Sequence, residues 1–212
     1  MNAERLLERF LRYVAVDTMA DDQSTTYPSS PGQLDLGKRV AAELVELGLR
    51  DVSHSEHGII MATIPATIDG DIPVVAFNAH LDTSPETSGA NVRPQLIRDY
   101  AGGDLTLPGD TSCVIRVADN PELNELLGCT LITTDGTTLL GGDDKAGVAI
   151  IVEAAQYLLE HPEIKHGPIR ILFTCDEEIG HGVDHVDLGE LGADVCYTLD
   201  GSGADCIDVE TF

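Results

Sequence analysis

Apolar side chains recur at helical spacing in three parts of the chain. In residues 3–14 they form one stripe, and the charged side chains are expected on the opposite face of a packed surface helix. In a second segment Ser30 stands at the N-cap, Pro31 at the first helical position, and Gly48 follows the last apolar position. A third apolar stripe runs through residues 144–160. The pattern therefore predicts three helices.

Five short segments are instead rich in Val, Ile, Thr or Phe, which is typical of β-strands. They are residues 58–64, 73–79, 129–133, 168–175 and 194–199. Because strands alternate with helices, the pattern predicts an α/β fold with a mostly parallel or mixed sheet flanked by helices. The stretch 84–121 is rich in Pro and Gly and has no sustained period, so we expect a long excursion from the sheet.

Composition narrows the class of protein. A chain of 212 residues with 42% hydrophobic residues is typical of a globular domain, and no apolar run approaches the roughly 20 residues that span a bilayer. The first ten residues carry charges where a secretory signal would be apolar, so we expect a cytoplasmic protein. The five cysteines lack CxxC spacing and are expected to be reduced, packed thiols.

The chain is strongly acidic. Twelve basic residues against 37 acidic ones give a formal net charge of −25, which would repel nucleic-acid phosphates and anionic lipid surfaces. We therefore expect no nucleic-acid partner and no membrane partner. Solubility or adaptation to salt accounts for carboxylates scattered over a surface, whereas carboxylates clustered at strand ends need a different explanation.

Polar side chains follow the predicted strands at their carboxyl ends, where open α/β sheets bind their ligands. His80 and Asp82 come directly after one apolar run. Three further segments contribute acidic groups, namely residues 143–144, 176–178 and 200. So many carboxylates in one cleft would force some to protonate unless a cation neutralises them. Each residue alone has an ordinary structural explanation, such as a helix cap, so the prediction of a metal site rests on their convergence.

The types of side chain favour particular metals. One imidazole among several carboxylates suits zinc, with manganese or cobalt as substitutes, whereas calcium favours an all-oxygen site. His181 and His185 have the spacing of a zinc-binding helix, but no glutamate follows the first histidine and Gly182 interrupts the segment, so we expect a loop. The glycine-rich segments lack the spacing of phosphate-binding loops, and no GxSxG elbow supports a serine hydrolase.

Five ordered blocks resemble the M20 family of dizinc metallopeptidases, and within it the aminotripeptidase branch. The blocks are HLDTSPE, NVRPQLIRDYAGGD, LLGCTLITTDGTTLLGGDDKAG, FTCDEEIGHG and YTLDG. HxD, GGDDKAG and DEE are general to the wider family, while NVRPQ and TLITTDGTTLLG narrow the match to this branch. The resemblance implies a metal-dependent aminopeptidase that releases the N-terminal residue of tripeptides, so small peptides are the expected partners.

The resemblance also implies a role for each residue of the site. The implied ligands of two zinc ions are His80, Asp143, Glu178 and Asp200. Asp143 would bridge both ions, with His80 and Asp200 completing the ligands of one and Glu178 binding the other. Asp82 would orient the imidazole of His80, and Glu177 would be the general base that takes a proton from water.

Members of the family are longer than this chain. They carry a smaller lid domain after the block that resembles YTLDG, and the chain then returns with a final histidine ligand. We therefore expect residues 1–212 to be the N-terminal segment of the catalytic domain, inactive alone, with exposed sheet edge or apolar surface that favours a homo-oligomer. The family also implies a cis peptide bond between Asp143 and Asp144.

Two alternatives remain open from the sequence. The site could belong to another M20-type hydrolase, such as an acylase, a desuccinylase or a dipeptidase. It could also belong to a non-catalytic metal-binding module. Glu177 argues against the second alternative, because a purely binding site has no use for a base that does not bind metal.

Overall fold

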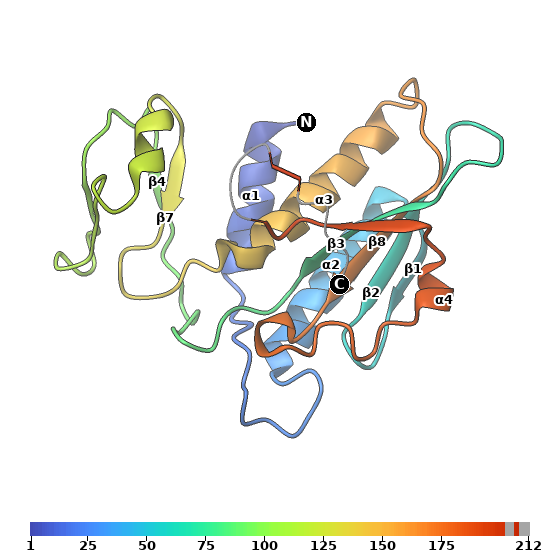
Figure 1. Cartoon of the computed structure of the whole chain (residues 1–212), viewed down its shortest axis with the longest axis horizontal. Helices are drawn as coiled ribbons and strands as arrows, with labels where there is room; N and C mark the ends of the chain where they lie inside the picture. The colour runs from blue at the N-terminus through green and yellow to red at the C-terminus, as the bar shows by residue number, and fades with distance from the viewer. Residues whose placement is uncertain (202–205, 208–212) are drawn as a thin grey trace.

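The computed structural model describes residues 1–201 and 206–207, and within them a five-stranded sheet forms the centre of the fold (Figure 1). The strands lie in the order β1, β2, β8, β3, β9. Their bounds are Arg50–His54 (β1), Ile60–Ile64 (β2), Val75–His80 (β3), Ile169–Thr174 (β8) and Val195–Thr198 (β9). Strand β3 runs parallel to β8 and β9, whereas β2 is antiparallel to β1 and β8. The sheet is therefore mixed.

The three predicted helices are present. They are α1 (Ala3–Val14), α2 (Pro31–Leu47) and α3 (Gly142–Glu160). Helix α2 begins after Ser30 and ends at Gly48, whose φ of 88° lies in the left-handed region that glycine adopts without a steric penalty. Helix α3 was expected from residue 144. Its first turn includes Asp143 and Asp144, both of which depart from helical geometry.

The hydrophobic core lies between one face of the sheet and the helices. Fully buried side chains from α2, α3 and the inner strands meet there, among them Leu36, Ala79, Val148, Ile171 and Phe173. A smaller buried cluster lies on the opposite face, where the short helix α4 (Leu188–Leu191) packs against β2, β3 and β8. Strands β3 and β8 therefore carry buried side chains on both faces of the sheet.

The stretch 84–121 leaves the central sheet, as predicted, and lies beside α1 in Figure 1. It contains β4 (Gln95–Ile97), β5 (Leu105–Thr106) and β6 (Val114–Ile115), and is followed by a 3-10 helix, Pro121–Glu125. Strand β7 (Leu131–Thr133) confirms the strand expected at 129–133, but it pairs with β4 in a separate two-stranded sheet. Four of the five predicted strands therefore lie in the central sheet, and its remaining strand, β1, was not predicted.

One expectation about α1 was wrong. Its charged side chains do not all face away from the core, because Arg9 is only 2% exposed and pairs with Glu43 of α2 and Glu153 of α3. The cysteines are unpaired, as expected. Only Cys175 is buried, however, so the expectation of packed thiols fails for the exposed ones, Cys129, Cys196 and Cys206. Among the described residues no helix is both long enough and apolar enough to cross a membrane.

Candidate metal centre

The topology of the sheet brings the predicted site residues to one edge. Strands β3 and β8 pair in parallel as far as His80, so the residues that follow both strands lie side by side. Asp82 follows β3, and residues 176–178 follow β8. Asp200 follows β9, the other parallel neighbour of β3. Asp143 reaches the same edge from the first turn of α3.

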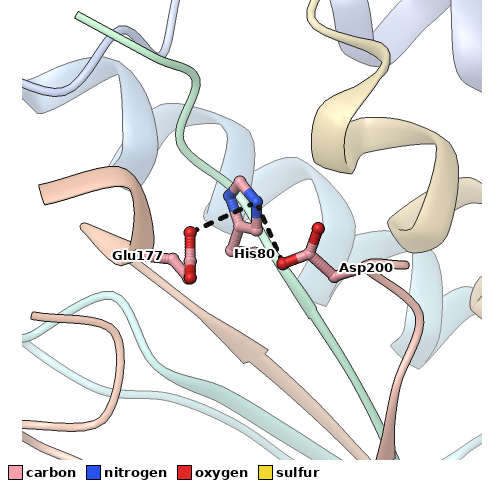
Figure 2. A group of neighbouring side chains, drawn as sticks. All are labelled: His80, Glu177 and Asp200. Carbon is pink, nitrogen blue, oxygen red and sulfur yellow. Dashed lines mark ion pairs between the residues drawn. The ribbon is translucent and has the colours of Figure 1, made fainter. Parts of the chain in front are cut away.

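His80 lies at the centre of this cluster. Figure 2 shows its imidazole between the carboxylates of Glu177 and Asp200, each with an oxygen 3.8 Å from Nε2. Asp143 Oδ1 is closer, at 3.0 Å from the same nitrogen. Two groups of three potential ligand atoms lie within 4.8 Å of one another: His80 with Glu177 and Asp200, and His80 with Asp143 and Glu178. The structure thus brings together all the residues that the sequence singled out as metal ligands or base.

Asp82 is fully buried and touches three parts of the site. One carboxylate oxygen lies 3.3 Å from His80 Nδ1. The two oxygens also accept the backbone N–H groups of Glu177 at 3.1 Å and Glu178 at 3.0 Å. Asp82 therefore stands where an orienting role for His80 requires it, and it fixes the backbone of both glutamates as well.

Asp144 holds the other side of His80. Its buried carboxylate accepts the backbone N–H groups of His80 and Gly147, both at 3.1 Å. The peptide bond between Asp143 and Asp144 is cis, as expected. The side chain of Asp143 is 71% exposed, whereas that of Asp144 is buried. These adjacent aspartates consequently face different surroundings, and only Asp143 belongs to a group of potential ligands.

Charge is concentrated in the cluster. Burial lowers the pKa of His80, but the hydrogen bond to Asp82 and the charges of Asp82, Asp144 and Asp200 outweigh this effect and raise the pKa to about 10. Burial raises the pKa of Glu177, Glu178 and Asp200, and neighbouring carboxylates add to the effect. A divalent cation would relieve this repulsion, and nitrogen with oxygen donors suits zinc, manganese or cobalt. The donor set therefore fits a metal centre.

Several buried polar residues near the site have no role predicted from the sequence. Ser29 and Gln33 bind the carboxylate of Asp176. Lys145 is buried and donates a hydrogen bond from Nζ to the carbonyl of Val16 at 2.8 Å. Lys145 lies within the GGDDKAG block, so its position in that motif could have pointed to a role. The contact between Ser29 and Asp176 could not be predicted, because residues so far apart in the chain leave no local pattern in the sequence.

The two histidines excluded from the site lie in a loop, as predicted. His181 Nδ1 is 2.7 Å from a carboxylate oxygen of Asp184, and the ring of His185 stacks on that of His57 with centroids 3.8 Å apart. Neither histidine belongs to the groups of potential ligands found in the described residues.

Comparison with known proteins agrees with this geometry. Residues 134–202 match the family described as Peptidase family M20/M25/M40. Over 209 residues the chain is 49% identical to peptidase T of Geobacillus thermodenitrificans, and the match covers 99% of this chain and 51% of that protein. A peptidase T of Clostridium botulinum is 47% identical over 207 residues, with the same 51% coverage. The chain thus spans about half the length of the curated relatives it matches.

Solved structures share the fold. Aminopeptidase PepT from Bacillus cereus superposes with a TM-score of 0.67 at 28% identity, covering 96% of this chain and 44% of that chain. The α/β architecture predicted from the sequence is therefore that of the catalytic domain of an M20 peptidase. Together with the sequence matches, this shows that the chain is a homologue of peptidase T over nearly its whole length, with the fold of an M20 peptidase.

Proposed function

We propose that residues 1–212 are the N-terminal segment of the catalytic domain of a dizinc aminopeptidase that releases the N-terminal residue of tripeptides. The observation that carries the proposal is the convergence of His80 with several carboxylates at the ends of β3, β8 and β9, in a chain 49% identical to a peptidase T. Small peptides with a free amino group are the proposed substrates.

The proposed metal ligands are divided between two ions. His80, Asp143 and Asp200 would hold one zinc ion, and Asp143 with Glu178 would hold the second; manganese or cobalt would be substitutes. The burial of His80 and its contacts with carboxylates support this assignment. When bound, two divalent cations supply Lewis-acid polarisation of a peptide carbonyl and lower the pKa of water.

Glu177 is the proposed general base. Its side chain is 49% exposed, so water and substrate can reach the carboxylate. Burial and the surrounding carboxylates raise its pKa above the ordinary value, and a carboxylate within reach of water can accept a proton and return it. Glu177 would take a proton from the attacking water and deliver it to the leaving amine. Asp82 holds its backbone in place during this transfer.

The proposal is tested with a chimera in which residues 1–212 replace the matching half of Geobacillus peptidase T. With zinc, the chimera should release the N-terminal residue of tripeptides and leave N-acetylated tripeptides intact. The 212-residue chain alone should be inactive, because a lid and further ligands are then lacking. The Geobacillus enzyme is the positive control. A folded chimera that hydrolyses N-acyl amino acids but not tripeptides would assign the site to another M20 activity.

A further inference from the structure

Asp176 occupies the turn between β8 and the two glutamates of the site. Its side chain is 1% exposed, yet it belongs to neither group of potential metal ligands in the described residues. Its φ is 58°, in the left-handed region that residues other than glycine rarely adopt. A buried carboxylate in an unfavourable backbone conformation needs partners that hold it there, because burying an unpaired charge is costly.

The partners of the Asp176 carboxylate come from one segment, at the beginning of α2. Ser29 donates its backbone N–H at 2.6 Å and its hydroxyl at 2.5 Å. Gln33 donates from Nε2 at 2.6 Å, and its Oε1 accepts the backbone N–H of Asp176 at 3.0 Å. The side chain of Gln33 is fully buried. We call Ser29, Gln33 and Asp176 the Asp176 clamp.

The clamp is one of two anchors on the same turn. Gln33 accepts the backbone N–H of Asp176, and Asp82 accepts the next two, those of Glu177 and Glu178. Three consecutive amides of the turn are thus bound by side chains from α2 and from the end of β3. Because the backbone of a residue determines where its side chain points, these contacts determine where both glutamate carboxylates lie relative to His80.

We propose that the Asp176 clamp positions Glu177 and Glu178 in the metal centre, so that Ser29, Gln33 and Asp176 are positioning residues of the site. The proposal rests on the proposed function, since it takes Glu178 as a metal ligand. The clamp acts through the backbone of the turn, and none of its side chains touches the metal or the substrate.

The hydrogen-bonding pattern allows a reciprocal test. Asp176→Asn and Gln33→Glu each disturb the contact: the first places an amide N–H₂ against donors, and the second places two carboxylates face to face. The double variant exchanges donor and acceptor, because an amide at position 176 can donate to a carboxylate at position 33. It also keeps one negative charge in the pair. Recovery in the double variant separates the specific contact from a general loss of packing.

Two quantities are measured. Binding of the second zinc ion, the one proposed beside Glu178, is measured on the zinc-loaded chimera, and hydrogen exchange is measured on the 212-residue chain. The affinity of the chimera for the second zinc ion, determined by competition with a chelator, should fall about 10- to 100-fold in each single variant. Hydrogen exchange of the Glu177 and Glu178 amides in the metal-free chain should accelerate at least about tenfold, because the turn opens more readily. The double variant should recover most of both losses.

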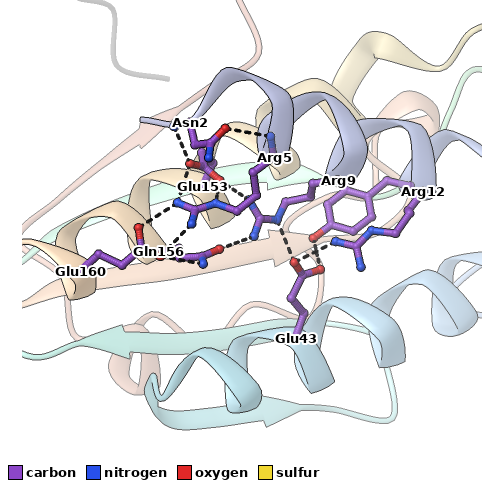
Figure 3. Close-up of polar contacts among 9 residues, drawn as sticks. Asn2, Arg5, Arg9, Arg12, Glu43, Glu153, Gln156 and Glu160 are labelled. Atoms are coloured by element: carbon purple, nitrogen blue, oxygen red, sulfur yellow. Dashed lines mark hydrogen bonds and ion pairs between the residues drawn. The ribbon is translucent and has the colours of Figure 1, made fainter.

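A matched control lies in the network between α1, α2 and α3 (Figure 3). Tyr13→Phe removes a hydrogen bond of 2.8 Å to Glu43, and Tyr13 is 3% exposed. This variant also loses a buried polar contact, but neither Tyr13 nor Glu43 is hydrogen-bonded to the turn that carries Glu177 and Glu178. Its zinc affinity and its amide exchange at positions 177 and 178 should equal those of the wild type.

Each outcome decides the proposal. Wild-type zinc affinity and wild-type amide protection in both single variants would overturn the clamp and leave the proposed metal centre intact. Failure of the double variant to recover would overturn the specific pairing of Gln33 with Asp176. If the chimera with the wild-type sequence binds no zinc, the proposed function loses its support. Amide exchange alone then tests the clamp. Loss of amide protection in the single variants, with its recovery in the double variant, would support the clamp.

Discussion

Asp82 joins the strands that carry the site. It contacts His80 at the end of β3 and accepts two N–H groups from the turn after β8. In Asp82→Asn one acceptor oxygen becomes an N–H₂ group that faces a donor, so either the imidazole or a glutamate loses its support. We expect the zinc affinity of the chain to fall about 10- to 100-fold. Chelator competition measures this change, and an affinity equal to that of the wild type would contradict the role given to Asp82.

Glu177 and Asp143 should differ in what their loss removes. In the zinc-loaded chimera, Glu177→Gln should abolish turnover while metal content stays near that of the wild type, because Glu177 is the proposed base. Asp143→Asn should instead lose metal, because Asp143 is the proposed bridge. Metal analysis and a tripeptide assay on the same preparations measure both effects. Equal zinc loss in the two variants would mean that Glu177 is a ligand, as its proximity to His80 and Asp200 also allows.

At the residue scale, the sequence predicted the convergence of the site but not its supports. His80, Asp143 and the glutamates stand directly at element ends, where topology alone implies that they meet. Ser29 and Asp176 are separated by 147 positions along the chain. Their contact depends on how α2 packs against the end of β8, and nothing in the local pattern around either residue indicates it.

At the scale of elements, α1 shows that the buried face of a helix can be wider than its apolar stripe. The helix is contacted by both α2 and α3, so side chains beside the stripe are buried as well. Arg9 donates to Glu43 at 2.8 Å and to Glu153 at 2.6 Å, and Arg5 also binds Glu153 (Figure 3). Burial of these charges is tolerated because each guanidinium meets a carboxylate.

Glu153→Gln tests this network. Burial raises the pKa of Glu153, but hydrogen bonds from Arg5, Asn2 and Arg9 outweigh it and lower the pKa to about 2 from an ordinary value of 4.5. Because the folded-state pKa is depressed, the stabilisation is present above the ordinary value and is lost as pH falls toward 2. We expect the variant to lose about 3 kcal/mol of unfolding free energy at pH ~7.

Denaturant unfolding of wild type and variant at neutral pH and at about pH 3 measures the difference. The difference in unfolding free energy between the two proteins should narrow at the lower pH. At about pH 3 the carboxylate is protonated in the unfolded chain but still ionised in the folded one, so the wild type takes up a proton on unfolding and loses stability. Glu160→Gln is the matched control, since Glu160 also binds Arg5 but its side chain is 45% exposed. A gap of the same size at both pH values would show that the charge of Glu153 does not stabilise the fold.

Helices and strands could be predicted from the sequence where their side chains are strongly buried, and some were missed elsewhere. Strand β1 was missed because its sequence, RDVSH, is mostly polar and it is held in place by pairing with β2. Strand β7 was found from its composition, but its pairing with β4 was not. That pairing depends on the course of the intervening excursion, for which the sequence has no periodic signal.

At the scale of the whole molecule, exposed apolar surface and net charge oppose each other. Strand β9 is at an edge of the central sheet, where Val195 is 44% and Tyr197 48% exposed. A mostly apolar cavity of about 520 Å³ also lies between α1, α3 and β7. Open edges and apolar patches favour association, whereas a net charge of −25 keeps copies apart.

We therefore expect the isolated chain to self-associate, and to do so more strongly as salt screens the repulsion. Sedimentation at low and high salt measures the association. Tyr197→Lys, which places a charge on the β9 edge, should weaken the association. Lys38→Ala, at an exposed position of α2, should not. A monomer at both salt concentrations would contradict the expectation.

The acidic cluster around His80 is proposed above to be a metal centre. The most direct test is a crystal of the chain grown with zinc, with anomalous diffraction measured at the zinc absorption edge. We expect a peak about 2.0–2.2 Å from His80 Nε2 and from oxygens of Asp143 and Asp200, with weaker or no occupancy beside Glu178. A folded chain with no zinc at this cluster, or with zinc only at other positions, would contradict the account.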